Sequence, residues 1–154
     1  MKSQKEKLTL DYFKGVFHTY EAINNPKSDV YFVFDIFDFE FKNSIKESFI
    51  ENFMEFKGAE FHLNKIHKND FFKVLNKWFY TEFNPNSINN KPSSEIIKDL
   101  VNDIVYSLDI SNFYRISSVK KNNKSIEREF GLMIDFIIIS SNDKAYFCEF
   151  LLDG

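Results

Sequence analysis

The sequence predicts a single α+β domain over residues 1–154, with about four helices packed on a mostly antiparallel sheet of four or five strands. Three observations support this fold class. Apolar residues recur at helical spacing in four segments, β-branched and aromatic runs lie between them, and the last third of the chain alternates strand-like runs with polar turns. A length of 154 residues fits one domain of ordinary size.

Helices are predicted over residues 9–23, 44–56, 70–83 and 94–108. Thr9 is a possible N-cap of the first helix. Ser44 and Glu47 have capping-box spacing at the start of the second helix, and Gly58 suits its C-terminal end. The second helix therefore has the clearest predicted start in the chain.

Strands are predicted over residues 29–42, 60–66, 113–119, 128–139 and 145–152. The last three read as a C-terminal β-meander, with residues 128–139 as a central strand covered by helices on at least one side. In the first strand the alternation changes phase between Ile36 and Phe37. A β-bulge would produce this change, so we expect one there.

Composition and motifs argue for a protein without cofactors. We expect a cytoplasmic protein that does not span a membrane. The amino terminus is charged, Cys148 is the single cysteine, and no apolar run approaches the length of roughly 20 residues that a spanning helix needs. A net charge of −3 argues against nonspecific nucleic-acid binding. The four glycines form no phosphate-binding loop, and His62, His67 and Cys148 fit no zinc pattern. We therefore expect neither metal nor nucleotide.

Charge is segregated along the chain. Residues 29–60 contain eight acids and three bases, whereas residues 61–80 contain four lysines and one acid. We expect the first strand and second helix to form a partner-binding acidic face, made of Asp35, Asp38, Glu40, Glu47, Glu51 and Glu55. The alternative is a solvated face that keeps an apolar chain soluble.

These features favour a small acidic protein-binding module rather than an enzyme. Small size, acidity and the lack of an active-site motif are typical of immunity proteins as a class, so we expect an inhibitor that neutralises a basic partner such as a bacterial toxin or nuclease domain. A homo-oligomer stays open, because the sequence does not tell which sheet edge is free.

Two other functions remain open. Asp38, Glu40 and Lys42 have the residue types of a metal-dependent nuclease, if alternate positions place them on one strand face. A small-ligand-binding domain would use an aromatic pocket between sheet and helices. A further carboxylate pair, Asp135 and Glu149, would face each other across the last hairpin if its turn has three residues, and would be diagonal neighbours if the turn has two or four. The alternative, which we favour, is that both carboxylates point to solvent on a half-exposed face.

Overall fold

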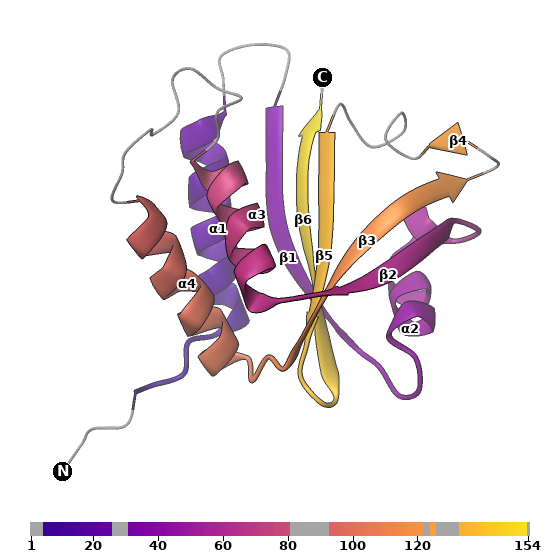
Figure 1. The fold of residues 1–154 in the computed structure, drawn as a ribbon, viewed down its shortest axis with the longest axis horizontal. Coiled ribbons are helices and arrows are strands. Elements are labelled where there is room, and N and C mark those ends of the chain that lie inside the picture. The colour runs from indigo at the N-terminus through magenta and orange to yellow at the C-terminus, as the bar shows by residue number, and fades with distance from the viewer. Residues whose placement is uncertain (1–4, 26–30, 81–92, 122–123, 126–132, 154) are drawn as a thin grey trace.

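The structure is a computed structural model that describes residues 5–25, 31–80, 93–121, 124–125 and 133–153. The helices are α1 (Leu10–Asn24), α2 (Ile45–Asn52), α3 (Lys68–Phe79) and α4 (Ser93–Ser107), with a short 3-10 helix η1 (Met54–Phe56). The strands are β1 (Tyr31–Glu40), β2 (Glu60–Ile66), β3 (Asn112–Lys121), β4 (Lys124–Ser125), β5 (Met133–Ser140) and β6 (Lys144–Asp153). They form one antiparallel sheet (Figure 1), which confirms the predicted α+β class with one more strand than expected.

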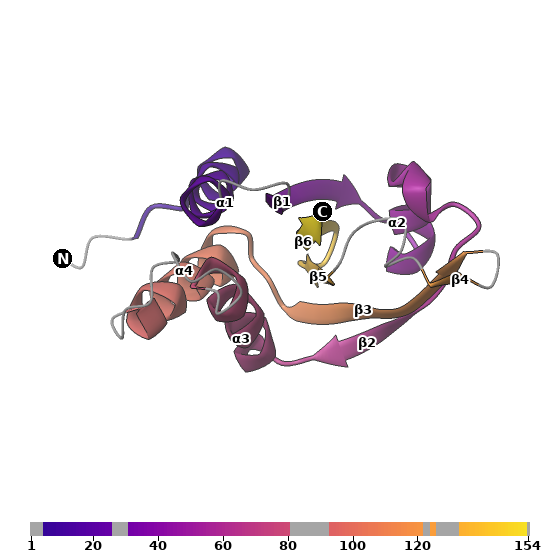
Figure 2. The same cartoon turned by 90° about the horizontal axis from the view of Figure 1, so that it is seen from above.

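The sheet lies between two layers of helix. Its strand order is β1-β6-β5-β3-β2, and β4 pairs with β3 outside this path. Helices α1, α3 and α4 lie on one face and α2 lies on the other (Figure 2). The neighbouring strands β3, β5 and β6 confirm the predicted C-terminal meander. No helix in the described part of the chain is long and apolar enough to cross a membrane.

The larger apolar cluster fills the space under α1, α3 and α4. Phe17 of α1 and Trp78 of α3 pack there against Phe34 of β1 and Phe150 of β6. The Phe34 ring centroid lies 5.9 Å from that of Trp78 and 5.9 Å from that of Phe150. Interlocked aromatic rings of this kind explain much of the high phenylalanine content as core packing.

A second apolar cluster holds α2 and η1 on the opposite face. Phe49 of α2 and Phe56 of η1 contact Phe39 of β1, Phe136 of β5 and Phe147 of β6. Alternate residues of the central strands thus point into the two different clusters. Burial on both faces explains why residues 133–139 are almost continuously apolar.

Strand β1 changes its buried face halfway along without a bulge. Its pairing with β6 has no register shift over its whole length, so the β-bulge predicted between Ile36 and Phe37 is wrong. Phe34 belongs to the cluster under α1 and α3, whereas Phe39 belongs to the cluster under α2. The buried positions switch because different helices cover opposite faces at the two ends of the strand.

The second helix is shorter than predicted. Helix α2 ends at Asn52, and Phe56 then anchors the separate turn η1. Glu55 therefore lies in η1 and not on the helix that carries Glu47 and Glu51. Gly58 follows η1 with a φ of 79°, a left-handed conformation that favours glycine.

Candidate functional site

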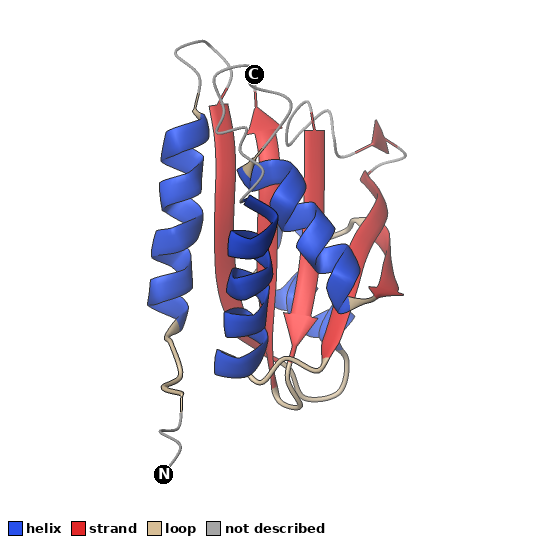
Figure 3. Ribbon diagram, turned by 60° about the vertical axis from the view of Figure 1, so that its left-hand side comes forward, coloured by secondary structure: helices blue, strands red, loops and turns tan. Residues whose placement is uncertain are grey.

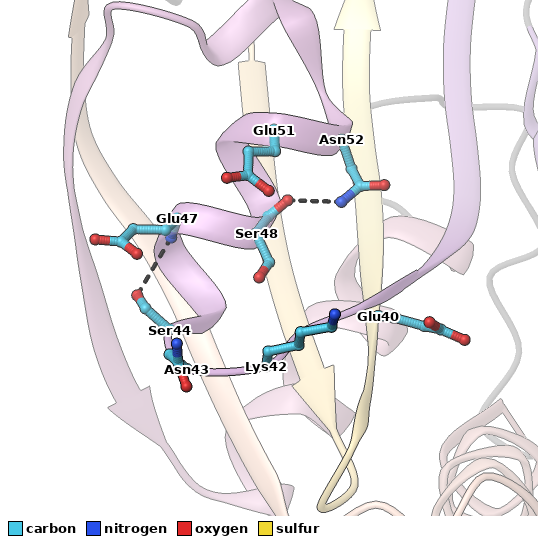
Figure 4. Close-up of a pocket in the computed structure, with 8 residues that line it drawn as sticks. All are labelled: Glu40, Lys42, Asn43, Ser44, Glu47, Ser48, Glu51 and Asn52. Carbon is cyan, nitrogen blue, oxygen red and sulfur yellow. Dashed lines mark hydrogen bonds between the residues drawn. The ribbon is translucent and has the colours of Figure 1, made fainter.

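Three of the six predicted acidic residues line one depression at the junction of β1 and α2 (Figure 4). The depression has a volume of about 630 Å³ and is lined by Glu40, Lys42, Asn43, Ser44, Glu47, Ser48, Glu51 and Asn52. The serines and asparagines were not predicted as site residues. Serine and asparagine are common around the start of any helix, so their presence in the sequence does not indicate a site. The fold shows that they line the same depression as the glutamates.

The N-terminal cap and a buried ring orient α2. Ser44 Oγ accepts a hydrogen bond from the Glu47 N–H at 3.3 Å. The return bond of a capping box does not form between these two described residues, so the Glu47 carboxylate remains at the surface. Phe49 on the inner side is fully buried, whereas Glu47 and Glu51 are exposed. Burial of Phe49 therefore directs both glutamates toward solvent.

The glutamates of this depression form no close ion pair within the part of the chain that the structure describes, although Glu40 lies opposite Lys144 in the β1–β6 ladder and its charge helps to raise the pKa of Lys144. Glu40, Glu47 and Glu51 take part in none of its ion pairs. The lining contains one cation, Lys42, whose side chain extends along the end of β1 while the Glu40 carboxylate points away from α2 (Figure 4). Like charges four residues apart on a helix cost a few tenths of a kcal/mol. This small cost is not offset by any ion pair within the described residues.

Asp35 does not line this depression, and its carboxylate contacts helix α1. Its carboxylate accepts hydrogen bonds from Lys14 Nζ at 2.9 Å and from the Ile36 N–H at 2.8 Å, and its Oδ2 lies 3.2 Å from His18 Nε2. The Asp35 side chain is 19% exposed. The structure thus places Asp35 in contact with α1 instead of on the acidic face.

Asp35 belongs to a set of acceptors that closes the β1 edge of the sheet. The Phe32 N–H donates to Asn25 Oδ1 at 2.7 Å, and the Phe34 N–H donates to Glu21 Oε1 at 3.0 Å. Helix α1 runs alongside this edge (Figure 3). Since unpaired edge groups invite pairing with other chains, these contacts protect β1 from strand addition.

Removing one of these acceptors is expected to destabilise the protein. Glu21→Ala leaves the Phe34 N–H without its acceptor and should lower the free energy of unfolding by about 1–2 kcal/mol. Glu21→Gln keeps an acceptor oxygen and should lose less. Chemical denaturation of both variants measures the difference, and an equal loss would contradict the edge-closing role.

The two remaining predicted acids, Asp38 and Glu55, are not among the residues that line the depression. Asp38 forms an ion pair with Lys144 at 3.1 Å, and this hydrogen bond raises the pKa of Lys144. Both side chains are well exposed, so the pair contributes little to stability. Glu55 is exposed in η1, outside the residues that line the depression.

Two carboxylates that were not predicted as a pair, Asp35 of β1 and Glu149 of β6, face each other across neighbouring strands. Asp35 is the direct register partner of Glu149, so the two side chains share a sheet face. Burial, as the largest cause, and the negative charges of Asp35, Glu55 and Glu21 together raise the pKa of Glu149 to about 7. Glu149 therefore titrates near neutral pH.

Asp135 and Glu149 are neither direct nor diagonal neighbours on one sheet face, so both arrangements considered for this pair are wrong. Asp135 is the register partner of Phe150, which places Asp135 and Glu149 on opposite faces of the sheet. The Asp135 carboxylate instead accepts hydrogen bonds from Trp78 Nε1 at 2.8 Å and Lys77 Nζ at 3.0 Å. These contacts fasten α3 to β5.

The geometry does not assemble the residues of the nuclease alternative. Strand β1 ends at Glu40, so Lys42 lies in the following bend and does not share a strand face with Asp38. Asp38 is paired with Lys144. Among the described residues, no group of three or more His, Cys, Asp or Glu side chains is placed to hold a metal ion.

The space between sheet and helices is filled by packed aromatic rings, which leaves the predicted ligand pocket without support there. A shallow depression of about 580 Å³ lies outside, along α1, where Tyr12 and Ile23 are 52% and 46% exposed. Cys148 is fully buried, and burial raises the pKa of its thiol. A reactive cysteine is therefore not supported.

The fold and the site together define a class: an α+β domain with an acidic depression between a strand end and a short helix. Searches of protein-family models, curated proteins and solved structures found no match to this chain.

Proposed function

We propose that this protein is a small acidic protein-binding module that inhibits a basic partner, in the manner of an immunity protein that neutralises a bacterial toxin in the cytoplasm. The observation that carries the proposal is the depression itself, whose lining includes Glu40, Glu47 and Glu51, none of which forms an ion pair with another described residue. Of the six predicted residues, Glu40, Glu47 and Glu51 line the depression, whereas Asp35, Asp38 and Glu55 do not.

The chemistry of the lining suits basic side chains. Carboxylates accept strong, charge-assisted hydrogen bonds from lysine and arginine. Serine hydroxyls and asparagine amides around them, such as Ser48 and Asn52, supply further polar contacts at the rim. An acidic concave surface also attracts a basic protein before contact, which raises the association rate.

The position of the depression favours a rigid recognition surface. Ser44 caps α2, and the Asn52 amide donates to the Ser48 carbonyl at 2.7 Å near the other end of the helix. Phe49 fixes the helix to the sheet from beneath. A surface that is already ordered loses little conformational entropy when a partner binds.

Removing the two helix charges tests the proposal. The variant Glu47→Gln/Glu51→Gln keeps side-chain size and removes both charges. Affinity purification with the wild-type protein, followed by mass spectrometry, identifies basic candidates, and stopped-flow association with each purified candidate then compares the variants. At low salt the association rate should fall by about tenfold, and the difference should shrink as salt screens the charges.

A matched control separates this site from net charge. Glu95→Gln/Asp99→Asn removes the same charge from exposed positions on α4, which lies on the other face of the sheet (Figure 2). This control should bind at nearly the wild-type rate. Equal slowing of both double variants would mean that only net charge matters, and unchanged binding of Glu47→Gln/Glu51→Gln would move the interface elsewhere.

A further inference from the structure

The two edges of the sheet differ in how they are protected. At β1, side chains of α1 and Asp35 accept hydrogen bonds from the outward N–H groups of Phe32, Phe34 and Ile36. Strand β2 forms the opposite edge and pairs only with β3. In Figure 2 no described helix lies beyond it. Among the described residues, one side chain bonds to an outward backbone group of β2: Lys46 donates to the Phe61 carbonyl at 2.7 Å.

The bond from Lys46 identifies which backbone groups face outward. A carbonyl reached by a lysine from α2 lies on the side of β2 away from β3. Backbone groups alternate in direction along a strand, so Leu63 and Lys65 share the edge of Phe61. Their backbone N–H and carbonyl groups form no hydrogen bond to a side chain of the described chain. The open part of the edge thus begins at Leu63.

Charge at this edge is positive. Lys57, Lys65 and Lys68 are exposed and have no ion pair within the described residues, whereas residues 57–68 contain one acid, Glu60. His62 and His67 are also exposed along this stretch. The surface therefore combines unpaired strand backbone with a local excess of cations.

We propose that β2 accepts an extended acidic segment of another protein as an additional strand. Main-chain hydrogen bonds to Leu63 and Lys65 would bind it, and the lysines around β2 would select acidic side chains. This binding surface is separate from the acidic depression and takes a partner of opposite charge, so it stands independently of the proposed function.

The same lysines argue against a second copy of this chain as the occupant. Antiparallel pairing of two β2 strands centred on Lys65 would place the two copies of this lysine directly opposite each other, and like charges across a ladder are destabilising. Pairing centred on Leu63 would still bring together two edges that each have a local excess of cations. Lysine on an edge strand is a recognised protection against self-pairing. Lysines on the edge do not repel a strand that has acidic side chains, and such a strand is the proposed partner.

A peptide that alternates glutamate and threonine is a suitable probe, because threonine favours extended structure. A length of about nine residues spans the seven residues of β2. In NMR titrations with the wild-type protein, the amide resonances of Leu63 and Lys65 should shift saturably, and added salt should weaken binding. A lysine–threonine peptide should not bind. A glutamate–threonine peptide N-methylated at two adjacent central residues should lose binding, because it cannot pair at either edge.

Protein variants separate charge from backbone. Lys65→Gln should weaken binding severalfold through charge alone. Lys65→Pro also removes the outward N–H and should abolish binding, while the fold should tolerate proline at an edge-strand position whose N–H faces away from β3. Lys98→Gln on α4 removes an exposed lysine elsewhere and should bind as the wild type does. Circular dichroism checks the fold of each variant, and the N-methylated peptide keeps the test valid if Lys65→Pro does not fold.

Several results would overturn the proposal. No saturable shift at about 1 mM acidic peptide would exclude even weak strand addition. Shifts centred outside β2 would move the site. Equal binding of the lysine–threonine peptide would mean that the lysines around β2 do not select acidic segments. Equal binding of the N-methylated peptide would exclude strand pairing.

Discussion

Replacing Glu149 by glutamine is expected to stabilise the protein at pH 8 by about 1–3 kcal/mol. Glu149 lies directly opposite Asp35 across the β1–β6 ladder and is partly buried. Burial and the neighbouring carboxylates raise its pKa from the ordinary 4.5 to about 7. At pH 8 the folded protein therefore holds a carboxylate where the neutral form is preferred. Glutamine removes this charge and keeps the shape of the side chain.

The sign of the pH dependence follows from the raised pKa. Between about pH 4.5 and 7 the folded protein retains a proton on Glu149 that the unfolded chain has released. The stabilising effect of this proton is complete below pH 4.5 and is lost as pH rises through about 7. The advantage of Glu149→Gln over the wild type should therefore be small at low pH and should grow through this window.

Urea denaturation at several pH values measures the difference in unfolding free energy between variant and wild type. Glu51→Gln, which changes an exposed glutamate of α2, is the control and should show little pH-dependent difference. A ¹³C NMR titration of the Glu149 carboxyl group gives the pKa directly. A difference between Glu149→Gln and wild type that stays constant from pH 4 to pH 8, or a less stable variant at pH 8, would contradict this account.

Local patterns predicted the elements well because they depend on near neighbours. Thr9 accepts a hydrogen bond from the Tyr12 N–H and caps α1 as expected, and Ser44 caps α2. The end of α2 was mispredicted, since the apolar spacing continues to Phe56 although the helix stops at Asn52. Packing of Phe56 in the second cluster, which spacing does not reveal, favours the separate turn.

The candidate site was predicted only in part because it depends on which faces the helices cover. Glu47 and Glu51 were correctly predicted to be exposed on one side of α2. Asp35 has the same local pattern as the other acids of β1, but it meets Lys14 because α1 lies against that edge. The contact between Asp35 and Lys14 depends on how α1 packs against β1, and residue spacing in the sequence does not predict that packing.

Strand register shows the same limit at the scale of one residue. The prediction for Asp135 and Glu149 depended on the turn of the last hairpin. The observed pairing of Ser140 with Ala145 shifts the register by one residue, and a one-residue shift turns every side chain to the other face. Glu149 then meets Asp35, and Asp135 meets Trp78. A single turn residue thus decided which carboxylates are neighbours.

Phe49→Ala is expected to have the largest effect on stability, with a loss of about 3–5 kcal/mol in unfolding free energy. Phe49 is fully buried, and its ring centroid lies 4.7 Å from that of Phe56 and 4.9 Å from that of Phe147. Helix α2 has eight residues, too few to be stable without packing. Loss of this ring should therefore release α2 and the acidic depression before the rest of the fold.

Hydrogen exchange can separate this local effect from general destabilisation, because the two apolar clusters lie on opposite faces of the sheet. Phe49→Ala should accelerate amide exchange in α2 far more than in α3, whereas Phe79→Ala, in the cluster under α1 and α3, should do the reverse. Phe49→Leu fills more of the site and should lose less stability than Phe49→Ala. Equal acceleration in both helices for both alanine variants would mean that the clusters unfold as one unit. In that case, the acidic depression would be as stable as the core beneath α3.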